Sequence, residues 1–248
     1  MDHFSLLLIL VFLAYILKGL TGFGPALIIV PFFTLLTGVE FALPASAVFD
    51  TVAGLILLLS LYRQINWRFC TPLFIAIGMG SFLGANIVIS VSPTLIRSIL
   101  ALVTLSFAIY LFFSGNNHPA TGEEAGRLAN RRVRSGAVLS AFAGGLTGGL
   151  AGISGPPIVI YLKQFFSKSF FRAQLTVVFL FENLVRLTVY YKGGLLKLNQ
   201  GKLILFLLPG LLTGLWIGSK LHFQISEKWF NRLVAIILLL VSLKIIFR

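Results

Sequence analysis

Apolar runs occupy almost the whole chain and are separated by short polar connections. Five runs, at about 4–19, 24–37, 44–62, 70–90 and 94–114, precede one long polar stretch. Five more follow, at about 136–150, 155–166, 173–191, 203–221 and 229–247. Such runs are typical of helices that cross a bilayer, each of which needs about 20 apolar residues. The pattern therefore predicts an all-α, polytopic membrane protein, in which the first two runs of each half are too short to span alone.

The two sets of runs resemble each other. Gly22 corresponds to Gly152 at an offset of 130, and Asp50 corresponds to Glu182 at an offset of 132. A nearly constant offset indicates an internal repeat. Each repeat is predicted to hold a broken helix pair followed by three transmembrane helices. The predicted parts are a first transmembrane repeat at 1–114, a polar linker at 115–134 and a second transmembrane repeat at 135–248.

Basic residues are distributed unevenly between the two sides of the predicted membrane segments. If successive runs alternate in direction, eleven loop arginines and lysines lie on the side of the linker. The other side receives only Arg97, Lys192, Lys197, Lys202 and Arg248. Because positive loops stay inside, this count predicts a cytoplasmic linker and two external termini. An odd number of crossings per half makes the repeats inverted, whereas one miscounted run would make them parallel.

Glycine and proline interrupt two of the apolar runs at equivalent places. Glycine lets the chain leave helical geometry, and proline can begin a helix because no backbone N–H is needed there. The half-helix after each break would present free N–H groups and the positive end of its dipole, which suits an anion. One such motif alone would be better explained by kinking or packing, but matching breaks in two halves predict a transporter's binding site. The two motifs are Thr21-Gly22-Phe23-Gly24-Pro25 and Gly152-Ile153-Ser154-Gly155-Pro156.

Among the polar residues within apolar runs, four are candidates for a role in transport, namely Asp50, Glu182, Asn183 and Arg186. Intramembrane charge is costly and by default marks a solute or proton path. Arg186 is the most attractive direct ligand, because its guanidinium fork matches an oxyanion. Asp50, Glu182 and Asn183 are candidates for coupling or gating. The alternatives are a purely structural pair of Glu182 with Arg186, one helical turn apart, and an interfacial position for Asp50.

Glycines also recur four residues apart at three other places. This spacing lets two helices approach closely, so we expect these glycines to serve helix packing. The three pairs are Gly80 and Gly84, Gly144 and Gly148, and Gly214 and Gly218.

Composition narrows the classes of function. The chain is 58% hydrophobic and 11% charged, with a formal net charge of +13. The basic residues cluster in short loops, which favours membrane topology and lipid headgroups over nucleic acid. Cys70 is the only cysteine, and the three histidines are scattered, so no metal or other cofactor is predicted. The sequence contains no nucleotide-binding loop or nucleophile elbow, so we expect a gradient-driven or partner-driven transporter and not an enzyme.

The stretch from Gly144 to Leu162 resembles the signature of the TauE/SafE sulfite-exporter family, and the stretch from Gly19 to Pro31 looks like a weaker form of it. The resemblance implies movement of sulfite, sulfonates or related organosulfur anions across the bacterial inner membrane. The residues themselves indicate only a small anionic substrate. A passive anion channel, a carrier of another anion such as a carboxylate, and a non-transporting subunit therefore remain alternatives. A homodimer within the lipid bilayer is expected.

Overall fold

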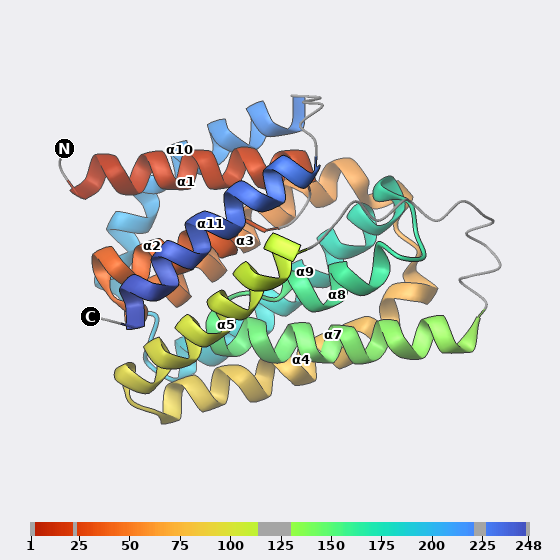
Figure 1. Ribbon diagram of the computed structural model, residues 1–248, viewed down its shortest axis with the longest axis horizontal. Coiled ribbons are helices and arrows are strands. Elements are labelled where there is room, and N and C mark those ends of the chain that lie inside the picture. Colours follow the sequence, from red (N-terminus) through yellow and green to blue (C-terminus); the bar gives the residue numbers. More distant parts are fainter. Residues whose placement is uncertain (1–2, 22–23, 114–129, 221–226, 247–248) are drawn as a thin grey trace.

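The computed structural model describes residues 3–21, 24–113, 130–220 and 227–246, and these residues are almost entirely helical (Figure 1). The all-α prediction is confirmed for this part of the chain. The helices are α1 (His3–Thr21), α2 (Pro25–Thr37), α3 (Val39–Leu61), α4 (Trp67–Ser90), α5 (Pro93–Phe113), α7 (Arg131–Ala151), α8 (Gly155–Leu162), α9 (Lys168–Lys192), α10 (Leu198–Lys220) and α11 (Glu227–Ile246), with a short 3₁₀ helix at Tyr62–Gln64 after α3.

Five segments among the described residues are long and apolar enough to cross a membrane. They fall within α3, α4, α5, α9 and α10, and α1 and α2 supply shorter apolar helices. Lipid-facing side chains account for the many large hydrophobic residues exposed on the surface, such as Leu59, Phe113 and Leu139. The protein is therefore a multi-pass membrane protein.

The runs on either side of each break, which are predicted to be half-helices too short to span alone, form helices of unequal length. Helix α1 has 19 residues and α7 has 21, and neither is among the five candidate spans of the described residues. Helices α2 and α8 have only 13 and 8 residues. Each break therefore follows a longer helix and precedes a short one.

Helices α4 and α7 lie side by side with their backbones in close approach (Figure 1). A methyl group added to Gly84 on α4 would lie 2.5 Å from the carbonyl oxygen of Leu146 on α7. A methyl group on Gly145 would overlap the carbonyl oxygen of Ile77. Glycine is needed at these positions because any side chain would separate the two helices.

The same arrangement recurs between α1 and α10, so each half of the chain contributes one helix to each tight pair. Methyl groups on Gly214 and Gly218 of α10 would overlap the carbonyl oxygens of Phe12 and Ile16 on α1. The packing role expected for this glycine pair, and for Gly80 and Gly84, is confirmed. Helices α3 and α9 pack against each other between the two pairs, and the start of α1 and the end of α11 lie at the same end of the molecule (Figure 1).

Candidate functional site

Each break contains a glycine in left-handed backbone geometry. Gly24 precedes α2 with φ 95° and ψ −1°, and Pro25 then begins the helix. Gly152 ends α7 with φ 72°, and its N–H donates to the carbonyl of Gly148 at 2.8 Å. Side chains other than glycine rarely adopt this geometry, so these two positions determine where the helices stop and restart. Of the remaining predicted residues of the first motif, Gly22, Phe23 and the side chain of Thr21 lie outside the described residues.

The two breaks meet at one small cavity of about 30 Å³. The first motif contributes Gly24 and Pro25, and the second contributes the segment from Ile153 to Pro156. The structure thus brings together residues that are about 130 positions apart in the sequence. The remaining lining residues are Lys18, Ala26, Leu27, Asp50, Phe179 and Asn183.

The first turns of α2 and α8 both open on this cavity. Their prolines carry no N–H, and the N–H of Leu27 donates to the carbonyl of Gly24 at 3.1 Å. Ala26 and Gly155 are therefore the first-turn residues that line the cavity and carry an N–H group not bonded within the helix. Two helix dipoles direct their positive ends to the same place, which favours an anionic ligand.

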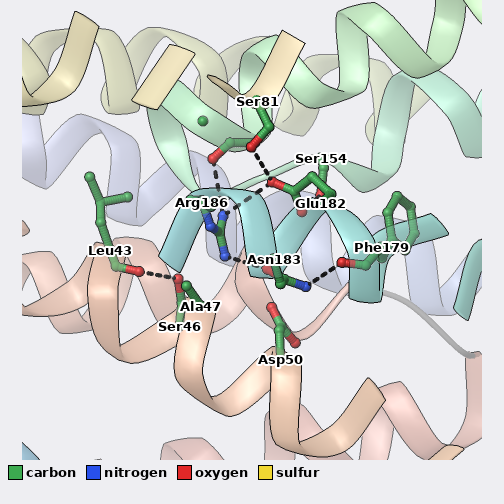
Figure 2. A network of polar contacts seen from close by, with 12 residues as sticks. Leu43, Ser46, Ala47, Asp50, Ser81, Ser154, Phe179, Glu182, Asn183 and Arg186 are labelled. Atoms are coloured by element: carbon green, nitrogen blue, oxygen red, sulfur yellow. Dashed lines mark hydrogen bonds and ion pairs between the residues drawn. The ribbon is translucent and has the colours of Figure 1, made fainter. Parts of the chain in front are cut away.

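Arg186 does not line the cavity and lies in a network of protein groups (Figure 2). It is fully buried, and its Nε has no hydrogen-bond partner among the described residues. One terminal nitrogen donates to the carbonyl of Gly148 at 3.0 Å and lies 4.0 Å from Oε1 of Glu182. The other terminal nitrogen donates to Oδ1 of Asn183 at 2.8 Å. Arg186 therefore reaches the cavity through Asn183, and its role as a direct anion ligand stays a prediction.

Glu182 is also fully buried and connects α9 to α4 and to the second break. The hydroxyl of Ser81 on α4 donates to its Oε1 at 3.2 Å, and the hydroxyl of Ser154 in the second break donates to its Oε2 at 3.3 Å (Figure 2). The hydroxyl of Ser154, which belongs to the predicted binding motif, is thus already donated to Glu182. Glu182 itself does not line the cavity.

The glycines at 144 and 148 face this region and not α4, which corrects their predicted packing role. A methyl group at Gly144 would lie 2.6 Å from the carbonyl oxygen of Ser154. One at Gly148 would lie 2.7 Å from Oε1 of Glu182. The close contact between α7 and α4 is made instead by Gly145 and Gly149. A shift of one position along a helix turns the side chain by about 100° around its axis.

Lys18 is the site residue that the sequence analysis missed. Its Nζ lies 2.6 Å from Oδ1 of Asp50, and the hydroxyl of Tyr15 donates to the same oxygen at 3.0 Å. Lys18 and Asp50 are each only 6% exposed, and both line the cavity. Lys18 is the only lysine or arginine before Arg63, which was an available signal. Its place at the end of an apolar run made it look like an ordinary flanking charge.

The interfacial alternative for Asp50 does not fit the structure. Helix α3 begins at Val39, earlier than the apolar run, so Asp50 lies at the middle of the helix and not near its start. It faces α9, where Asn183 lines the same cavity (Figure 2). The side chains of the site are balanced in charge, with two cations, Lys18 and Arg186, against two carboxylates. The net attraction for an anion therefore comes from the helix ends unless one carboxylate is neutralised.

A multi-pass helical protein whose two broken helix pairs open on one small cavity that contains a buried ion pair has the architecture of a membrane transporter. The chain belongs to the family described as Sulfite exporter TauE/SafE, whose model matches residues 7–245. Membership in this family implies a membrane transporter of sulfite-type anions. No curated protein and no solved structure matches the chain.

Proposed function

We propose that the protein is a secondary transporter that carries small sulfur-containing anions, such as sulfite or organosulfonates, across the bacterial inner membrane. The observation that carries this proposal is that the two breaks line the same small cavity together with Lys18, Asp50 and Asn183. A scaffold protein has no need for broken helices inside the membrane, where unpaired backbone groups are costly.

The anion would bind at the N–H groups of Ala26 and Gly155, with Asn183 as a further polar contact. Such a site holds negative charge through backbone dipoles, which need no excess of cationic side chains. The hydroxyl of Ser154 would turn from Glu182 to the bound anion. The site therefore offers several donors to the oxygen atoms of a compact oxyanion.

Alternating access would come from two inverted repeats that expose the cavity to one side of the membrane at a time. Helices α1 and α7 occupy equivalent positions in the two halves and run in opposite directions in Figure 1, which supports inversion. The excess of basic loops on the linker side supports a cytoplasmic linker. A homodimer is part of the same proposal.

Binding and flux of purified protein test this function. Sulfite, thiosulfate, taurine and sulfoacetate are compared by thermal shift, with acetate as a carboxylate control. Proteoliposomes should then take up the best ligand in a saturable manner that depends on an ion gradient. Flux that does not saturate would favour the anion channel, and stronger stabilisation by acetate than by any sulfur anion would favour a carboxylate carrier.

A further inference from the structure

We propose that Lys18 is the cationic ligand of the transported anion and that Asp50 is the proton acceptor that releases it. In this scheme one proton enters the site with each anion bound at Lys18. The inference rests on the proposed transport function and adds the residue that recognises the charge and the ion that is coupled to it.

The two buried ion pairs of the site differ in how they can exchange partners. Arg186 and Glu182 do not line the cavity and are held by protein groups from α4, α7, α9 and the second break. Lys18 and Asp50 both line the cavity, and their contact of 2.6 Å is next to the space that a ligand would fill. An incoming anion can therefore replace the carboxylate of Asp50 at the ammonium of Lys18 without dismantling the rest of the network.

Charge balance requires a proton in this exchange. While Asp50 is ionised, the pair is neutral, and an anion entering the cavity would place a second negative charge beside the first. When the carboxylate takes a proton from water that reaches the cavity, it becomes a neutral acid, and Lys18 keeps its positive charge for the anion. On the opposite side of the membrane Asp50 returns the proton to water, the ion pair forms again and the anion leaves.

The other charged groups around Asp50 keep a fixed balance during this step. Helix α1 brings Lys18 and Tyr15, and α9 brings the mutually paired Glu182 and Arg186. Helix α2 carries no ionisable side chain. Among the remaining neighbours of α3, the ionisable groups of α5 are Arg97 and Tyr110, those of α10 are Lys202 and Lys220, and those of the 3₁₀ helix are Tyr62 and Arg63, all toward the ends of their helices.

The same pair links ligand charge to helix movement. Both donors that the described residues place on the carboxylate of Asp50 belong to α1, which leads directly into the first break. Protonation of Asp50 weakens this attachment between α1 and α3. The binding event thus loosens the helix whose end forms one wall of the cavity.

Three variants separate these roles: Lys18→Gln, Asp50→Asn and the double variant Lys18→Gln/Asp50→Asn. Arg97→Gln, which removes an exposed positive charge at the start of α5, is the matched control. The probes are isethionate and thiosulfate, because neither titrates near neutral pH. Binding is measured by calorimetry across mildly acidic to mildly alkaline pH, and proton movement is measured with a pH dye trapped in proteoliposomes.

The wild-type protein and the Arg97→Gln control should bind the probe more tightly as pH falls. For one coupled proton, the affinity should rise by at most about tenfold for each pH unit. Asp50→Asn should bind with no pH dependence and should exchange anion without moving protons. Lys18→Gln should lose binding by at least about tenfold. The double variant keeps a neutral pair of similar shape, so it should fold and still fail to bind, even if the single Lys18 variant is unstable.

Two results would overturn the inference and leave the transport function intact. One is wild-type affinity in the folded double variant, and the other is wild-type proton movement in Asp50→Asn. If the wild-type protein binds neither these probes nor sulfite or taurine, the proposed function itself fails and the inference fails with it.

Discussion

The hydroxyl of Ser154 donates a hydrogen bond of 3.3 Å to Oε2 of Glu182, which ties the second break to the centre of α9. Ser81 donates to the other carboxylate oxygen from α4 at 3.2 Å. Glu182 thus fixes the second break at the cavity, although it is not itself a lining residue. An anion that approaches Ser154 must compete with Glu182 for its hydroxyl.

Replacing Ser154 by Ala tests whether this hydroxyl reaches the anion. Glu182 keeps Ser81 and Arg186 as partners, so the free energy of unfolding should fall by only about 1 kcal/mol. Sulfite binding, measured by thermal shift, should weaken clearly. Ser140→Ala is the control, because its hydroxyl donates to a carbonyl of its own helix and is not a lining residue. Equal sulfite binding by both variants would remove Ser154 from the site.

Gly152→Ala should destabilise the second break. The left-handed φ of 72° costs an alanine about 1–2 kcal/mol, and the new methyl group would lie 2.9 Å from Cγ2 of Val30. Gly194→Ala is a matched control, since Gly194 has φ 73° and no neighbour within 4 Å of the added carbon. Denaturant unfolding in detergent should show the larger loss for Gly152→Ala. A similar loss in both variants would mean that the break can absorb the added methyl group.

Glu182 and Arg186 should behave as a coupled buried pair. Removing one partner leaves an uncompensated buried charge, which typically costs about 3–5 kcal/mol, whereas Glu182→Gln/Arg186→Gln removes both charges. The double variant should therefore be more stable than either single variant. Its affinity for sulfite should still be lower than that of the wild-type protein, because Arg186 orients Asn183 at the cavity. Thermal unfolding and sulfite binding check both points, and wild-type affinity in the folded double variant would exclude Arg186 from any binding role.

Cysteine labelling tests the orientation in the membrane. Cys70 is buried, with its Sγ 3.2 Å from Oε1 of Gln174, and Cys70→Ser keeps a group that can make this contact. In this background, cysteines introduced at Arg131 and Lys168 should react only from the cytoplasmic side. A cysteine added at the C-terminus should react from outside. Labelling of positions 131 and 168 from different sides would contradict the predicted alternation of the membrane segments.

The broken helices could be predicted because glycine and proline have strong local effects. Helix boundaries were harder to predict, because a charged residue or a proline interrupts an apolar run without ending the helix. Helix α3 shows this, because it starts at Val39 and includes Glu40 and Pro44, whereas the predicted apolar run begins at 44. Pro44 has no N–H, so the helix continues through it without the hydrogen bond to the carbonyl of Glu40.

The tertiary partners of the buried charges could not be predicted from local pattern. Glu182 and Arg186 are one turn apart on one helix, so their contact follows from helical spacing. Asp50 and Lys18 lie on different helices, and only packing of α1 against the rest of the molecule brings them together. Asn183 lines the cavity and Arg186 does not, and this difference likewise depends on which face α9 turns toward the cavity.

The pairing of α1 with α10 has a consequence for how the protein is made. Helix α1 is synthesised before α10, which carries the glycine face that fits against it. At about 5–20 residues per second, the ribosome needs on the order of ten seconds or more to supply α10. Meanwhile Lys18 is an intramembrane charge, and Asp50, available as soon as α3 has emerged, is its first protein partner. The ion pair at the cavity would thus also protect the chain during synthesis, because it would hold α1 in the bilayer until α10 is made.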